Sequence, residues 1–281
     1  MKQPALILVT LLPFVASAAA RLDPAAVVVW DEYIRNAEAK AQKRLLPGAR
    51  FLWLDESESL LAKVKEGEVV AVPMSPHNPQ RVPSGLIHDW LGAIFIANAT
   101  LDEARTVLRD YAHYKDYFPD NVIEAKALEL GELKDRSALI LRSQSFFLRS
   151  ALDAEYESRY FPLDAHRLFT TTKTTRIQEV EGYGTANRKV HQEGEGTGAV
   201  WKVSTMTRYL ERDGGVYVEV EAIVLSRDIP AGLRWAVEPV VRRVSRSSLF
   251  TSLRQTEAAI NKRMEARRSI PESKGKAFAG R

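Results

Sequence analysis

The sequence predicts an α+β protein in which a long run of antiparallel strands is preceded and followed by helices. Three observations predict this arrangement. An amphipathic helical pattern begins at Pro24, strand-like runs separated by turn signals fill residues 121–225, and a second long amphipathic pattern follows. The 281 residues are 45% hydrophobic, which is enough material for one or two buried cores.

The composition excludes several classes of protein. The chain has no cysteine, so disulfide scaffolds, thiolate zinc sites and cysteine nucleophiles are ruled out. Its 40 basic and 36 acidic residues leave a formal net charge of +4, which is too small to indicate a nucleic-acid partner. The charge is uneven, because 13 basic and only 5 acidic residues lie between Arg227 and the end. The last part of the chain is therefore locally basic.

The first residues have the order of a secretory signal peptide. Lys2 precedes an uncharged apolar run over residues 5–16, and small residues follow. We expect residues 1–20 to be a signal peptide that is cleaved after Ala18 or Ala20. A membrane anchor is the alternative, but the apolar run is shorter than the roughly 20 residues that a helix needs to cross a bilayer. The mature protein is therefore expected to be periplasmic or secreted.

Residues 21–80 are expected to form a small N-terminal elaboration. Asp23 caps a helix that has Pro24 in its first turn, and the helical pattern ends near Pro47-Gly48. The next segments predict a strand over 51–54, a helix over 57–65 and a strand over 69–72. Four prolines, at 73, 76, 79 and 83, then predict a loop. The sequence leaves open whether the first helix packs on this chain or on a partner.

A strand and a capped helix come next. The segment from Leu86 to Ala97 is apolar and long enough for a strand. Thr100 and Glu103 have the spacing of a capping box, and the helical pattern then extends to Phe118. Thr100 also completes a glycosylation sequon with Asn98, but a helix cap explains the threonine without a sugar.

The clearest strand of the central region runs from Leu152 to Tyr160. Apolar or small residues alternate there with charged residues, so one face is buried and the other is wet. The alternation places Tyr156 and Tyr160 on the buried face.

A hairpin is predicted from Val200 to Ser226. It turns at Asp213-Gly214, a dipeptide that suits a tight two-residue turn. The more apolar of its two faces is expected to point into the protein, and it carries Trp201, Val203, Thr205, Thr207, Tyr209, Val218, Val220, Ala222, Val224 and Ser226. The other face pairs Arg208 with Glu219. A one-residue slip would exchange the two faces.

The chain closes with helices and a tail. Residues 230–243 predict a short helix that Pro239 breaks or kinks, and residues 247–267 predict a longer amphipathic helix with a basic back. The basic C-terminal region could make a peripheral contact with an anionic membrane, but without an aromatic wedge we favour a solvated face. Residues 268–281 are expected to be a disordered basic tail.

No motif for metal or phosphate chemistry is present. The five histidines, at 77, 88, 113, 166 and 191, lack the spacing of a metal site. The chain has no serine-nucleophile elbow and no phosphate-binding loop with its lysine. We therefore expect neither a metal nor a cofactor.

Three groups of side chains could serve acid–base chemistry or ligand binding. Glu219 and Glu221 lie on one strand face, but a cross-strand ion pair with Arg208 is the simpler interpretation. His88 and Asp89 are adjacent on a strand, so their side chains point to opposite faces and cannot cooperate directly. Tyrosines recur at 111, 114 and 117, and they could line a pocket, although core packing is the simpler interpretation.

The order of strand, capped helix, meander and long final helix resembles the START-like superfamily, also called SRPBCC. That superfamily includes polyketide cyclase-like and coenzyme Q-binding-type proteins, and the chain resembles its uncharacterised exported bacterial members. The resemblance covers roughly residues 51–260 and is carried by segments 82–95, 110–111 with Tyr117, 175–180, 211–219 and 225–233. The group commonly reads Gly-Phe-Leu-Trp after its central glycine loop, whereas this chain reads Gly198-Ala199-Val200-Trp201.

The resemblance implies a helix-grip fold over residues 81–267, in which a curved antiparallel sheet wraps around the C-terminal helix. It also implies a cavity between sheet and helix that holds a lipid, an isoprenoid or a polyketide-like molecule. The expected lining is Trp201, Val203, Thr205, Tyr209, Val218, Val220, Val224, Tyr156, Tyr160, Tyr117 and His88. A cyclase or hydrolase that uses His88 and Tyr117, and an interaction module with a filled core, are the alternatives.

Overall fold

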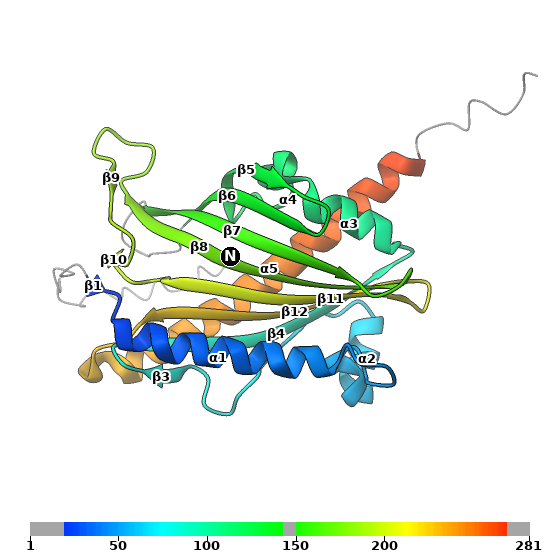
Figure 1. Cartoon of the computed structure of the whole chain (residues 1–281), viewed down its shortest axis with the longest axis horizontal. Helices are drawn as coiled ribbons and strands as arrows, with labels where there is room; N and C mark the ends of the chain where they lie inside the picture. The colour runs from blue at the N-terminus through cyan, green and yellow to red at the C-terminus, as the bar shows by residue number, and fades with distance from the viewer. Residues whose placement is uncertain (1–19, 143–149, 269–281) are drawn as a thin grey trace, which may run out of the picture.

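A ten-stranded antiparallel sheet carries a helix layer on each face (Figure 1). The computed structural model describes residues 20–142 and 150–268. The helices are α1 (Pro24–Lys43), α2 (Glu58–Lys65), α3 (Leu101–Arg109), α4 (Tyr114–Tyr117) and α5 (Arg234–Arg268), with 3₁₀ turns η1 (Trp53–Glu56), η2 (Tyr111–His113) and η3 (Ala231–Leu233). The expected signal peptide up to residue 19 and the expected tail from residue 269 lie outside the described residues.

The main sheet has the strand order β2-β4-β12-β11-β8-β7-β6-β5, with short strands β3 and β9 beside β4 and β8. Its strands are β2 (Val70–Pro73), β3 (Gln80–Val82), β4 (Gly85–Ala97), β5 (Val122–Leu130), β6 (Lys134–Arg142), β7 (Ser150–Pro162), β8 (Arg167–Glu181), β9 (Lys189–Val190), β11 (Lys202–Arg212) and β12 (Gly215–Arg227). Strand β1 (Ala20–Arg21) pairs separately with β10 (Glu195–Gly196). The curved sheet and the long helix α5 confirm the predicted α+β, helix-grip arrangement.

The hairpin of β11 and β12 has the predicted register. Arg208 pairs with Glu219, and the two strands join through the two-residue turn Asp213-Gly214. Both turn residues have positive φ angles, of 58° and 76°, as this turn type requires. The local turn chemistry therefore set the pairing of this hairpin.

Helix α5 lies against the inner face of the sheet, which we define as the face that carries Ile94 and Val218. It passes behind the strands in Figure 1. Leu249 and Leu253 approach Gly92 of β4 so closely that a Cβ atom there would lie 2.8 Å from both side chains. Gly92 therefore allows the helix to touch the strand backbone. The surrounding apolar side chains, including Ile260 and Met264, form one core cluster.

Helix α1 covers the opposite, outer face, in front of the strands in Figure 1. Trp30, Ala37 and Ala41 of α1 pack with Met206 and Tyr217 of the hairpin. The sequence predicted that one hairpin face would be the buried one, and this was incomplete, because both faces are buried. The N-terminal helix therefore packs on its own chain.

Three predicted elements differ from the structure. The first is the strand that was expected over residues 51–54. Its end forms the 3₁₀ turn η1 instead. The backbone amides of Trp53 and Leu54 donate to the two carboxylate oxygens of Glu219, each at 3.0 Å. These amides are bound by a side chain, so they form no strand ladder.

The capped helix also ends earlier than predicted. The capping box of Thr100 and Glu103 is present, but α3 stops at Arg109 and does not extend to Phe118. Asp110 leaves the helical conformation, and its carboxylate accepts hydrogen bonds from Tyr117 and His113, both at 2.7 Å. Arg109, the last residue of α3, donates to Asp135 of β6.

The C-terminal helix is continuous where the sequence predicted two pieces. Pro239 lies inside α5 without ending it. The proline falls within the second turn of the helix, so the backbone hydrogen bond that it removes lies close to an end where some amides have no helical partner.

Candidate functional site

Cross-strand rows on the inner face change from fully buried to partly exposed along the sheet. The row of Tyr209, Val218 and Ile94 is buried within the core cluster beneath α5. In the next row, Val220 is partly exposed and lies beside Gly92, where Leu249 and Leu253 touch the strand. The solid core therefore ends at this contact.

The next two rows form a partly exposed apolar surface. Thr205, Ala222 and Trp90 are cross-strand neighbours, and all three are partly exposed. In the row beyond, Val203 and Val224 are partly exposed as well. We call these five residues of β11, β12 and β4 the open wall. An apolar surface with one hydroxyl is the composition that small-molecule pockets show.

Strands β6 and β7 extend the open wall on one side. Tyr156 and Leu141 are partly exposed and pack, like Val203, against the small cluster of Leu152, Ala154 and Ile177. Burial raises the pKa of the Tyr156 phenol above its usual range, so the hydroxyl stays protonated and can donate a hydrogen bond.

His88 lies at the other side of the open wall, directly across from Val224 on the neighbouring strand. Its Nε2 lies 2.9 Å from Ser226 Oγ, and that hydroxyl also donates to the Arg227 carbonyl oxygen at 3.2 Å. The serine oxygen therefore accepts from an Nε2–H, which leaves Nδ1 as an acceptor. Nδ1 is buried and has no hydrogen-bond partner among the described residues. Burial lowers the pKa of His88 to about 4, so the ring is neutral near neutral pH.

A polar network holds the other end of the inner face. Asp135 is 1% exposed and accepts from Arg109 at 2.6 and 2.8 Å and from Tyr160 at 2.9 Å. Tyr111 lies 3.1 Å from the Tyr160 hydroxyl. This network is satisfied internally. Of the tyrosine stripe, Tyr111 is therefore a core residue, as the simpler interpretation held.

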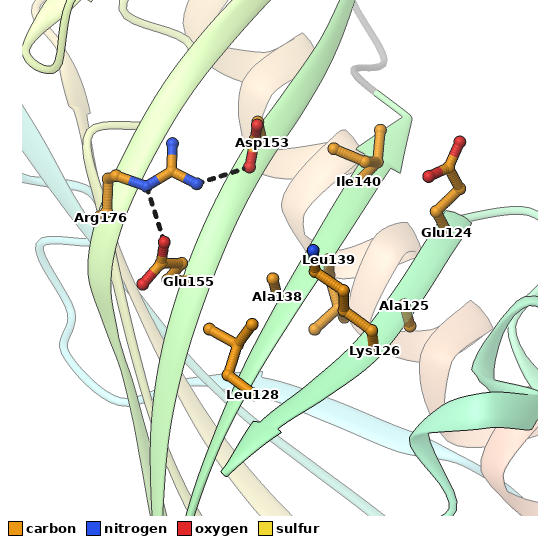
Figure 2. Close-up of a pocket in the computed structure, with 10 residues that line it drawn as sticks. All are labelled: Glu124, Ala125, Lys126, Leu128, Ala138, Leu139, Ile140, Asp153, Glu155 and Arg176. Carbon is orange, nitrogen blue, oxygen red and sulfur yellow. Dashed lines mark hydrogen bonds and ion pairs between the residues drawn. The ribbon is translucent and has the colours of Figure 1, made fainter.

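A small pocket lies on the outer face of the sheet. Figure 2 shows it over β5, β6, β7 and β8, where Arg176 donates to Asp153 and Glu155. Its volume is about 220 Å³, and it is lined by Glu124, Ala125, Lys126, Leu128, Ala138, Leu139, Ile140, Asp153, Glu155 and Arg176. This is below the ~300 Å³ at which ligand pockets usually begin. Its arginine already has two carboxylate partners.

The structure does not bring all the predicted lining residues together. Val203, Thr205, Val224, Val220 and Tyr156 lie on or beside the partly exposed inner surface. Tyr209, Val218 and Tyr160 are buried in the solid core. His88 is buried against Ser226, and Tyr117 is bound to Asp110, so these two have different partners.

Trp201 lies elsewhere. It stands just before β11 and packs with the outer-face cluster beneath α1, at 9% exposure. Its amide donates to the Leu225 carbonyl oxygen at 2.7 Å, yet its ring leaves the inner face. A Cβ atom at Gly198 would lie 2.7 Å from this ring, so the glycine loop closes over the tryptophan.

Trp90, Ala222 and Leu141 belong to the inner surface but were absent from the predicted lining. Trp90 is two residues from His88 on β4, so the alternation of strand side chains placed it on the same face. That signal was available in the sequence. Which inner residues are open to solvent depends on where α5 touches the sheet.

The paired glutamates lie on the outer face, beneath α1. Arg208 is 2% exposed and donates to the fully buried Glu219 at 3.2 Å, which confirms the predicted cross-strand ion pair. Burial, together with the nearby charge of Asp89, raises the pKa of Glu221 to about 7. Asp89 accepts from Tyr33 of α1 at 2.7 Å, and burial raises its pKa to about 6. His88 and Asp89 thus serve opposite faces, as predicted.

Residues 20–142 and 150–268 lack two features that would suggest other functions. No group of three or more histidine, aspartate or glutamate side chains is arranged to hold a metal ion. No helix in the same part of the chain is both long and apolar enough to cross a membrane.

No family model and no curated protein matches the chain. Solved structures similar to it include a STAR-related lipid transfer protein fragment from Xanthomonas axonopodis, at 13% identity over 65% of this chain and 96% of that one, with a TM-score of 0.46. Human STARD10 is similar at 13% identity over 81% of this chain and 87% of that one, with a TM-score of 0.44. The aromatase/cyclase Zhui from a Streptomyces species shows 15% identity over 66% and 98%, with a TM-score of 0.41.

These likenesses concern the fold alone. The chain's own sheet order and its long helix α5 have the START-like, helix-grip arrangement that the sequence resemblance implied.

Proposed function

We propose that this protein binds a hydrophobic small molecule between the open wall and the first half of α5. The single observation that carries the proposal is the change from a solid inner core at Tyr209 and Val218 to partly exposed apolar side chains two rows further along. Apolar surface of this kind gains about 25 cal/mol for each Å² that a ligand removes from water.

The less exposed side of the helix offers a matching surface. Val237, Val241 and Val244 recur at intervals of four and three residues, so they lie on one side of α5, and all three are partly exposed. An apolar guest between these valines and the open wall would cover both surfaces. The hydroxyls of Thr205 and Tyr156 would orient its polar group.

Native mass spectrometry tests the proposal directly. Protein purified from cells is expected to carry a hydrophobic molecule that is released by denaturation. A panel of lipids, isoprenoids and polyketide-like compounds is expected to include at least one that raises the melting temperature, because a ligand that binds only the folded state stabilises it. Absence of both results would refute ligand binding.

Two filling variants locate the site. Ala222→Phe places a ring on the open wall, and Ala138→Phe is the matched change in the outer pocket of Figure 2. We expect A222F to weaken ligand binding by roughly tenfold or more and A138F to leave it unchanged. Val224→Phe is a second filling variant if A222F does not fold, as judged by circular dichroism. The opposite ranking of A222F and A138F would move the site to the outer face.

We also propose export with cleavage after Ala18. Ala20 pairs with Gly196, and the Leu22 amide donates to the Gly194 carbonyl oxygen at 2.8 Å. Cleavage after Ala20 would remove half of the two-residue strand β1. N-terminal sequencing of exported protein is expected to begin at residue 19. A mature chain that begins at Arg21, or a chain retained in the cytoplasm, would contradict this.

A further inference from the structure

The first half of α5 exposes large apolar side chains to solvent. Trp235 is 82% exposed, Val240 45% and Phe250 42%. Exposed aromatic rings on a helix that otherwise packs against the protein are unusual, because each ring loses favourable burial. From the sequence we favoured a solvated face for this basic region because it lacked an aromatic wedge, and the exposed Trp235 is such a wedge.

Arginines share the face that carries the exposed aromatic rings. Trp235, Arg243, Arg246 and Phe250 are separated by eight, three and four residues. At 3.6 residues per turn, these four positions fall within roughly a quarter of the helix circumference. We call them the docking face. Both arginines are exposed, and neither forms an ion pair with any residue in the described part of the chain.

The first half of α5, which carries the docking face, has a positive net charge. Between Arg234 and Phe250 the sequence holds four arginines and one acidic residue, Glu238. Glu238 is already paired, with Arg242 at 2.8 Å and with Arg81 at 3.8 Å. Because the nearby carboxylate is occupied, Arg243 and Arg246 are available to an external anion.

We propose that the docking face binds the surface of an anionic lipid bilayer. A helix with aromatic rings and arginines along one exposed stripe lies in the membrane interface, where the rings enter the headgroup boundary and the arginines meet lipid phosphates. A bilayer fits better than a small anion, because the apolar rings need an apolar partner beside the phosphates. The docking face is on the solvent side of α5, so this proposal is independent of the proposed ligand site.

Vesicle binding of the purified protein tests the proposal. Sedimentation with phosphatidylcholine vesicles that contain phosphatidylglycerol is expected to recover the protein, and vesicles of phosphatidylcholine alone are expected to recover much less. High salt is expected to weaken the binding, because the arginines contribute through screened charge. Equal binding to both vesicle types, or no binding to either, would overturn the proposal.

Charge variants assign the contact to the docking face. R243Q/R246Q is expected to weaken binding to anionic vesicles by roughly 30-fold, since each basic residue near such a surface contributes about fivefold. K115Q/K189Q removes two charges from exposed lysines of α4 and β9 and is the matched control, expected to bind like the unmodified protein. Equal losses in the two variants would show a non-specific charge effect and refute the assignment.

Fluorescence tests the depth of the aromatic ring. Trp235 is the most exposed large apolar side chain of the described residues, whereas Trp30 and Trp201 are buried. Brominated lipids in anionic vesicles are therefore expected to quench part of the tryptophan emission, and Trp235→Phe is expected to abolish most of that quenching. Trp53→Phe is the control, expected to retain it. Quenching that persists in W235F would place the membrane contact elsewhere.

Discussion

The two faces of the β4-β12-β11 sheet are both buried, but by different physical means. The outer face, beneath α1, buries Arg208, Glu219 and Asp89, each with a defined hydrogen-bond partner. The inner face, beneath α5, buries mostly apolar side chains and becomes partly exposed at the open wall. Directional bonds fix the outer layer in one arrangement, whereas the apolar contacts of the inner layer carry no such directional constraint.

The largest expected loss of stability comes from removing the buried ion pair of the outer face. Glu219→Ala leaves Arg208 buried without its partner and removes the acceptor of the Trp53 and Leu54 amides. We expect the free energy of unfolding to fall by about 3–5 kcal/mol, as measured by urea denaturation.

A partly exposed glutamate whose ion-pair partners lie at the surface provides the control for Glu219. Glu157 pairs with Lys134 and Arg159, whose side chains are about half exposed. Because exposed ion pairs contribute little, Glu157→Ala is expected to cost less than about 1 kcal/mol. Similar losses in the two variants would show that the buried pair contributes no more than a surface pair.

The next effect is a pH dependence that belongs to the outer face. Folding raises the pKa of Glu221 from 4.5 to about 7, chiefly by burial, so the folded protein holds a proton that the unfolded chain has already lost near pH 6. The stabilising contribution is therefore complete below about pH 4.5 and is lost as the pH rises through 7. Glu221→Gln is expected to reduce the fall in unfolding free energy between pH 5 and pH 8 by about 2–3 kcal/mol.

A variant at Asp89 separates the contributions of the two buried carboxyl groups to this pH dependence. The pKa of Asp89 is raised to about 6, again mainly by burial, so part of the same fall is expected to persist in E221Q. Asp89→Asn combined with E221Q should remove most of it. If E221Q unfolds with the same pH profile as the unmodified protein, Glu221 is not protonated in the folded state.

The smallest expected effect concerns the inner face. Gly92→Ala places a Cβ atom 2.8 Å from Leu249 and Leu253, so α5 must move away from β4. Overpacking of this kind is expected to cost about 1–2 kcal/mol in a thermal or urea melt. Gly232→Ala is the control, because nothing lies within 4 Å of a Cβ atom there. A G92A protein as stable as G232A would show that α5 yields freely at this contact.

Much of the fold was predictable because it rests on local chemistry. The turn at Asp213-Gly214 set the hairpin register, and the Thr100–Glu103 box set the start of α3. Strand alternation placed Tyr156 and Val203 on the inner face. The same local patterns failed at residues 51–54, whose amides are bound by Glu219, a residue more than 160 positions away.

Prediction of the candidate site was only partial, for the same reason. Residue patterns alone cannot separate Tyr209, which is buried in the solid core, from Val224, which is partly exposed, since both are apolar inward positions on one hairpin. The ring of Trp201 also left its expected face and packs in the cluster beneath α1, a contact that the pattern of the hairpin does not predict.

The sequence by itself determined the α+β class, the strand faces and the hairpin pairing, because periodicity, caps and turn residues act over a few neighbouring positions. Only the tertiary structure decided that α1 buries the charged outer face and that the contact of Leu249 and Leu253 with Gly92 ends the solid core. Both outcomes depend on where two distant helices lie across the sheet. That position is set by packing between segments far apart in the chain, which no local pattern records.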